Sequence, residues 1–84
     1  MIMSEQLLKA AVRVEELQDI LGRRIEVKLQ VGGFNIVVAD HGLLRRTCTM
    51  PFRDLQTYSD NGLLADAIEH CVRRCDRELK AGED

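Results

Sequence analysis

The chain has 84 residues, 45% of them hydrophobic, and its 12 basic and 14 acidic side chains give a formal net charge of −2. A domain of this length buries only about 60 to 65% of its unfolded surface, so residues 1–84 are expected to form a single small domain with nothing left over for a second module. No apolar run approaches the roughly 20 residues needed to cross a bilayer, and the balanced charge supplies no overall attraction to nucleic acid or anionic lipid.

Residues 4 to about 21 have the pattern of an amphipathic helix. Ser4 is expected to cap it, Glu5 lies near the positive end of the helix dipole, and Gly22 is a natural stop. The apolar positions recur at three- and four-residue steps and predict the buried stripe, which comprises Leu7, Ala11, Val14, Leu17 and Leu21.

From Arg24 the apolar period changes to two, which predicts a half-buried strand up to Val31. Gly32 and Gly33 favour a two-residue hairpin turn, because glycine tolerates the positive φ angles that such turns need. This turn gives a register in which every pair on the inner face is apolar, and the pairs are Val31 with Phe34, Leu29 with Ile36, and Val27 with Val38.

A third strand is expected from about Leu43 to Met50, after a turn at residues 40–42, and Pro51 should end it. A turn with an odd number of residues would direct three apolar side chains inward, those of Leu44, Cys48 and Met50. A two-residue turn would instead direct Arg45, Thr47 and Thr49 inward, which the core would reject. The odd turn is therefore favoured, and Arg46 must then reach water from the edge of the sheet.

Residues 52–58 are expected to be irregular, with at most one helical turn at 54–56, and residues 59–62 have the composition of a helix cap. A second long helix should then reach about Lys80 and stop before Gly82. Its apolar stripe comprises Leu64, Ala67, Ile68, Cys71, Val72, Cys75 and Leu79.

These elements predict an α+β fold of the order helix, three-stranded antiparallel meander, helix (αβββα), with both helices on one face of the sheet. The order is similar to that of double-stranded RNA-binding domains, and the resemblance is one of topology. Such domains present a lysine cluster at the start of the second helix to grip phosphates. Here that end carries Asp60 and Asp66, so nucleic-acid binding would need another basic surface, built from Arg45, Arg53, Arg73 and Arg77.

Five side chains are the candidates for a metal site: His41, Cys48, His70, Cys71 and Cys75. His70 lies about 100 degrees around the helix from Cys71, whereas both helix cysteines belong to the buried stripe, so neither a metal nor a disulfide is expected. His41 could act as a general base beside Asp40, but Asp, His and Gly are also ordinary turn residues and no nucleophile lies at a telling spacing. We expect no enzyme, no catalytic residue and no cofactor.

The start of the chain shows neither a basic leader followed by an apolar stretch nor a small-residue cleavage site, so no export signal is expected. The three cysteines are an odd set without the spacing of a secreted disulfide scaffold. The sequence therefore predicts a cytoplasmic protein with reduced thiols and no membrane partner.

The features that the fold does not need suggest a protein partner. Leu8 and Val12 lie one helical turn apart, away from the predicted stripe, and the first strand is an expected sheet edge able to pair with its own copy. The other candidate partner-binding residues are Val37, Arg45 and Thr47 on the open sheet face and Arg73 and Arg77 on the second helix.

The leading hypothesis is a non-catalytic protein-binding module, acting as a small regulator, inhibitor or assembly factor and forming a homodimer. Short phage-encoded inhibitors of host systems fall in the same size class. The alternative is nucleic-acid binding through the arginines. Replacing Leu8 and Val12 by glutamate is expected to dissociate the homodimer without loss of helical content.

Overall fold

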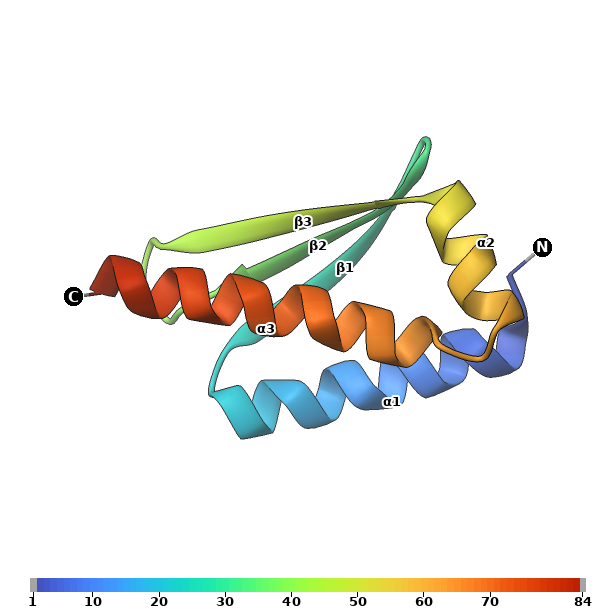
Figure 1. The fold of residues 1–84 in the computed structure, drawn as a ribbon. Coiled ribbons are helices and arrows are strands. Elements are labelled where there is room, and N and C mark those ends of the chain that lie inside the picture. Colours follow the sequence, from blue (N-terminus) through green and yellow to red (C-terminus); the bar gives the residue numbers. More distant parts are fainter. Residues whose placement is uncertain (1, 84) are drawn as a thin grey trace.

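The computed structural model describes residues 2–83, so the first and last residues of the predicted domain lie outside it. The elements are α1 (Ser4–Leu21), β1 (Arg24–Gln30), β2 (Gly33–Ala39), β3 (Arg45–Pro51), α2 (Phe52–Asp60) and α3 (Leu64–Glu83). The strands form an antiparallel meander in the order β1-β2-β3. The long helices α1 and α3 lie on the same face of this sheet, and the other face is open (Figure 1). The predicted α+β architecture is confirmed, with the short helix α2 as an addition.

Helices α1 and α3 run side by side in the same direction (Figure 1). Three polar contacts join α1 and its flanking residues to α2 and α3. The Met3 amide donates to the Ser59 hydroxyl, Arg13 pairs with Glu69, and Arg23 pairs with Asp76. Helix α1 packs along α3 and meets β1 at few positions. Helix α1 is therefore docked mainly on α3 and only weakly on the sheet.

The predicted ends of α1 are half right. Met3, not Ser4, is the N-cap residue; its backbone is extended and no side chain caps the helix. Gly22 does end the helix, in the left-handed conformation with φ 62°, and its N–H donates to the Gln18 carbonyl. Glycine adopts this conformation without the steric cost that a Cβ imposes.

The predicted stripe of α1 is wrong in its first half. Leu17 is buried and Val14 and Leu21 are half-buried, as expected, but Leu7 and Ala11 are exposed. Gln6 and Ala10, one residue earlier in each case, are buried instead. Helix α1 directs the line through Gln6, Ala10 and Leu17 inward, because its main contact is α3 rather than the sheet. Leu7 and Ala11 each lie about 100 degrees around the helix from the residue before them and therefore face outward.

The β1–β2 hairpin has a register two residues away from the predicted one. Val31 and Gly32 make the turn, and Leu29 lies opposite Phe34. A shift of two preserves which face each side chain occupies, so the predicted alternation holds. Gly33 lies in β2, opposite Pro51 of β3. This position requires glycine, because a Cβ there would overlap the Met50 carbonyl oxygen and lie 2.9 Å from the Pro51 Cα.

The inner face of β1 is far less covered than predicted. Ile25 is buried, but Val27 is 38% exposed, Leu29 is 72% exposed and Val31 at the turn is fully exposed. Figure 1 shows the reason, since α1 approaches β1 where the two elements are connected and the hairpin then diverges from it. The core therefore lies over β2 and β3, under α3.

Strand β3 confirms the odd turn. Residues 40–44 connect the strands, Cys48 and Met50 are buried, and Thr47 and Thr49 are exposed. The strand begins at Arg45, so Leu44, which was expected to face the core, is instead a partly exposed loop residue. Arg46 reaches out from the inner face toward Glu78 on α3, at 4.0 Å.

Residues 52–60 form helix α2, where an irregular segment was predicted. Its two buried residues, Leu55 and Ser59, are four apart and so lie on one face of the helix. Helix α3 has the predicted stripe, since each of its seven members is buried or half-buried, but it continues to Glu83 rather than ending near Lys80. Among the described residues, no helix is both long and apolar enough to cross a membrane.

Candidate protein-binding surface

An apolar groove opens where α1 and the β1–β2 hairpin diverge. Its volume is 260 Å³, and its lining comes from both long helices and two strands: Leu7, Ala10, Ala11, Val14, Val27, Phe34 and Ile68. Every one of these side chains is apolar. The sequence did not reveal this groove, because its prediction placed Leu7 and Val27 in the closed interior between helix and sheet.

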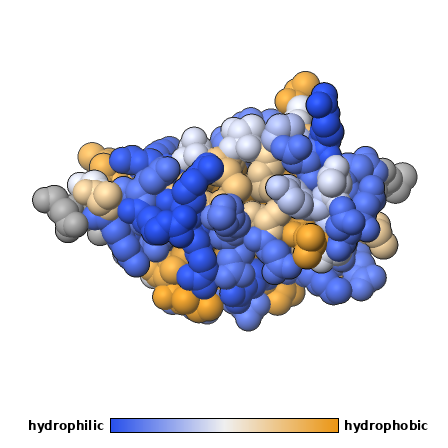
Figure 2. All heavy atoms as spheres, in the orientation of Figure 1, coloured by the Kyte–Doolittle hydropathy of each residue, from blue (hydrophilic) through white to orange (hydrophobic). Residues whose placement is uncertain are grey.

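Further apolar side chains extend the groove outward on both sides. Leu8 and Val12 on α1 are 67% and 53% exposed, and Leu29 on β1 continues the row begun by Val27. We call Leu7, Leu8, Val12, Val27 and Leu29 the α1–β1 surface. In Figure 2 the side chains over α3 are hydrophilic, whereas hydrophobic ones gather along the lower margin, over α1, and at the hairpin tip. On α1, Leu8 and Val12 adjoin Leu7 and Ala11, which line the groove together with Val27, so the predicted residues border an apolar surface that also includes β1.

Three of the predicted partner-binding residues lie together on the open face of the sheet. Val37 is paired with Thr47 across β2 and β3, and Arg45 follows two residues from Thr47 on the same side. A shallow hollow of 110 Å³ between Arg45, Val37 and β1 is lined largely by charged side chains. This face is polar and is turned away from the α1–β1 surface.

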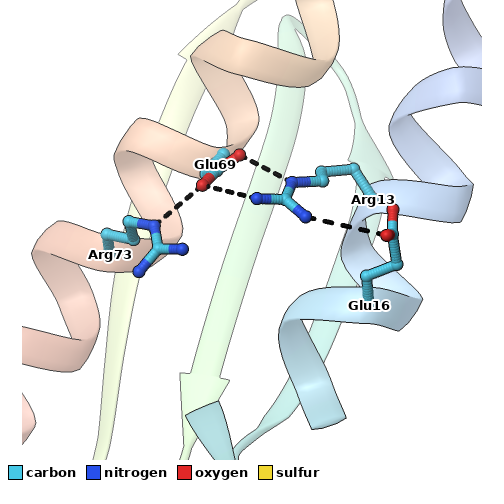
Figure 3. A network of polar contacts seen from close by, with 4 residues as sticks. All are labelled: Arg13, Glu16, Glu69 and Arg73. Atoms are coloured by element: carbon cyan, nitrogen blue, oxygen red, sulfur yellow. Dashed lines mark hydrogen bonds and ion pairs between the residues drawn. The ribbon is translucent and has the colours of Figure 1, made fainter. Parts of the chain in front are cut away.

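The other two predicted residues, Arg73 and Arg77, lie on α3. Arg73 donates from Nε to Glu69 at 2.8 Å, and Glu69 also accepts two hydrogen bonds from Arg13 (Figure 3). These hydrogen bonds, led by that of Arg13, lower the pKa of Glu69 from 4.5 to about 2, and the same pairing raises the pKa of Arg13. Arg73 is therefore paired with a carboxylate that it shares with Arg13, whereas Arg77 is an exposed cation beyond the network.

The predicted basic surface of Arg45, Arg53, Arg73 and Arg77 is not assembled on one face. Arg45 lies on the open side of the sheet and Arg73 on the helix layer that covers the opposite side. Arg53 is on α2, at the far end of the molecule from the C-terminal half of α3 (Figure 1). Phosphate binding gains from several cations acting together, and this arrangement separates them.

Arg23 and Asp76 form a buried ion pair that the sequence did not predict. Asp76 accepts a hydrogen bond from Arg23 Nε at 2.8 Å, and the two side chains are 5% and 8% exposed. Burial acts to raise the pKa of Asp76, but the hydrogen bonds from Arg23 and Lys80 prevail, so that the pKa is lowered. The pair joins the α1–β1 connection to α3.

A second depression, of 470 Å³, lies between β3, α2 and α3 and is lined by polar as well as apolar groups, among them Tyr58, Asp66, His70 and Arg74. Cys48 and Cys71 at its floor form a disulfide, with their Cα atoms 6.1 Å apart. The expectation of reduced thiols without a bridge is thus wrong for this pair, because β3 and α3 bring together two cysteines that are 23 residues apart in sequence.

The remaining candidate ligands do not converge with these. Cys75 is buried, and burial raises the pKa of its thiol. His41 is exposed in the 40–44 loop and does not line the depression that holds His70. Within residues 2–83, no group of three or more His, Cys, Asp or Glu side chains is placed to hold a metal ion.

Comparison of the chain with protein-family models, with curated proteins and with solved structures finds no match. The arguments below therefore depend on the geometry of the chain itself.

Proposed function

We propose that this chain is a non-catalytic protein-binding module, which acts as a small regulator, inhibitor or assembly factor by covering part of a partner's surface. The single observation that carries the proposal is the α1–β1 surface, where large apolar side chains are exposed around an apolar groove. Contiguous apolar surface on a soluble domain is costly unless a partner covers it, and it is the usual mark of a protein-binding site.

The charge distribution supports a protein partner over nucleic acid. The cations nearest the helix layer, Arg13, Arg23 and Arg73, are each engaged with a carboxylate. The net charge is −2, so these pairs leave no large excess of positive charge to attract phosphates.

The test is capture of a partner from the native host with the tagged chain, followed by quantitative mass spectrometry. Three proteins are compared: the natural chain, Leu8→Glu with Val12→Glu, and a control with Leu43→Glu and Leu63→Glu. The control adds the same two charges at leucines that are 95% and 47% exposed but lie outside the α1–β1 surface. We expect a protein to be enriched by the natural chain and the control, and to be lost with the Leu8 and Val12 variant.

The alternative function, nucleic-acid binding, is tested by repeating the capture over a salt series with and without nuclease treatment. Capture that depends on nucleic acid and falls steeply with salt, irrespective of Leu8 and Val12, would contradict the proposal.

A further inference from the structure

Strand β1 is an edge of the sheet, and one hydrogen bond shows which of its backbone groups face outward. The Ile25 N–H donates to the side-chain oxygen Oε1 of Gln18 at 3.0 Å, away from β2. In an antiparallel ladder, residues alternate between facing the neighbouring strand and facing away from it. Val27 and Leu29, two and four residues on, therefore direct their N–H and C=O groups to the free edge.

The side chains along this edge divide cleanly by face. On the inner face, next to the groove, are the exposed Val27 and Leu29, and on the open face are Glu26 and Lys28. The ion pair between Lys28 and Glu26 within the strand is long, at 3.7 Å, and exposed. The edge thus offers unpaired backbone groups, an apolar row and two opposite charges.

We propose that a second copy of this chain binds here, with the two β1 strands antiparallel around a two-fold axis at Val27. The result is a continuous six-stranded sheet with the helices of both copies on one side. This inference deepens the proposed function and rests on it, since it names a second copy as one protein that the α1–β1 surface binds.

Charge complementarity selects the register. With the axis at Val27, Glu26 lies opposite Lys28 of the second copy, and Lys28 lies opposite its Glu26. Both of these cross-strand pairs join opposite charges on the open face of the sheet. On the inner face, Val27 meets its own copy and Ile25 meets Leu29, so that each facing pair is apolar.

The neighbouring registers are unfavourable. A shift of the axis to Glu26 sets Glu26 against itself, and a shift to Lys28 sets Lys28 against itself. Like charges directly opposite one another destabilise a strand pair. A shift to Ile25 sets Val27 opposite Arg23, which lies outside the strand and is paired with Asp76. In the Val27 register the Ile25 amide keeps its hydrogen bond to Gln18, and the two strands are joined through the N–H groups of Val27 and Leu29. An axis between two residues places apolar side chains opposite charged ones.

The other edge of the sheet is less suited to a second copy. Cys48 and Met50 on the inner face of β3 are already buried, so pairing there covers no exposed apolar row. Pro51 ends the strand and has no N–H to donate. The β1 edge is therefore the one that a second copy would use.

The first test is the oligomeric state, measured by sedimentation velocity over a concentration series. We expect the natural chain to dimerise, and Glu26→Lys or Lys28→Glu alone to raise the dimer dissociation constant about tenfold or more. Mixing the two variants should restore a dimer, because one strand then carries two lysines and the other two glutamates. A chain that stays monomeric at every concentration overturns the inference.

The second test fixes the register by cross-linking, with oxidised glutathione as the oxidant. Glu26 and Lys28 of the second copy would have Cα atoms about 4.5 Å apart, within the range of a disulfide. We expect a covalent dimer from an equimolar mixture of Glu26→Cys and Lys28→Cys, and little from either alone. Cross-linking of either variant with itself, or none in the mixture, contradicts the register.

These variants leave Leu8 and Val12 unchanged, so the two proposals fail separately. A monomer that still captures a partner through Leu8 and Val12 overturns the dimer alone. A dimer that cross-links as expected but captures no partner supports the inference and limits the function to self-association.

Discussion

Arg13 and Glu69 join the two long helices by a bidentate ion pair, with Arg13 Nε 2.6 Å from one carboxylate oxygen and Nη2 2.8 Å from the other. The fork of a guanidinium matches a carboxylate in this geometry, which fixes both the distance and the rotation between the helices. The rotation matters because it leaves Leu7 and Ala11 outside the core.

The pair predicts a specific loss of stability in acid. The pKa of Glu69 is about 2 in the folded protein against 4.5 ordinarily, so its stabilising contribution is full above about pH 4.5 and disappears as the pH falls toward 2. Glu69→Gln should remove this part of the pH dependence, of order 1 to 3 kcal/mol, in urea unfolding measured from pH 2 to 7. The control is Glu15→Gln, an exposed acid of α1. Equal pH profiles for Glu69→Gln and the natural chain would contradict the assignment.

Breaking the buried ion pair of Arg23 and Asp76 should lower the free energy of unfolding more than breaking an exposed ion pair. Asp76→Asn removes a buried carboxylate from the Arg23 guanidinium, which is 8% exposed, and should lower the free energy of unfolding by about 3 kcal/mol. The matched variant Glu78→Gln removes the half-exposed partner of Arg46 and should cost less than about 1 kcal/mol. Urea unfolding of both at pH 7 checks the order, and equal costs would show that the burial of Asp76 does not matter.

Gly33 should be intolerant of a side chain because β3 approaches its backbone. Gly33→Ala places a Cβ against Met50 and Pro51, and we expect a loss of at least about 2 kcal/mol as the two strands separate locally. Gly32→Ala is the comparison, since Gly32 has φ 101° but open space around it and should cost about 1 kcal/mol of backbone strain. Thermal unfolding decides between them, and a larger loss at Gly32 would refute the close approach as the cause.

The exposed leucine and valine of α1 should be dispensable for folding. Leu8→Glu with Val12→Glu is expected to leave the helical circular dichroism unchanged and to alter the free energy of unfolding by less than about 1 kcal/mol. Leu17→Ala in the same helix removes a fully buried side chain and should cost about 2 to 5 kcal/mol. If the double variant unfolds, Leu8 and Val12 are structural and the partner-capture comparison loses its basis.

The hydrophobic periodicity of the sequence predicted most helices and strands, but not how much of each is buried by its neighbours. The alternation from Ile25 to Val31 and the stripe of α3 both follow from periodicities that the structure retains. The turn lies one residue earlier than predicted, and the pairing is therefore offset by two, because Gly33 belongs to β2, where β3 approaches its backbone in a contact between segments about 17 residues apart. Helix α2 was missed because its nine residues are too few for a period to be established, and of Phe52, Leu55 and Tyr58 only Leu55 is buried.

The candidate surface could be only partly anticipated. Leu8 and Val12 could be found from the sequence because they lie outside the predicted buried stripe of α1. Leu7, Val27 and Leu29 could not, because their pattern is that of core residues and only the position of α1 exposes them. The disulfide of Cys48 with Cys71 and the ion pair of Arg23 with Asp76 were missed for the same reason, since each joins residues that only the packed fold brings together.

By itself, the sequence determined the periodicity of each element and hence the α+β class, the meander and the two faces of the sheet, because these depend on interactions between near neighbours in the chain. The tertiary structure alone decided that α1 packs mainly on α3 and only weakly on β1, because that choice depends on contacts between residues more than 50 positions apart, such as Arg13 with Glu69. The bare edge of β1 and the apolar groove beside it are consequences of that choice.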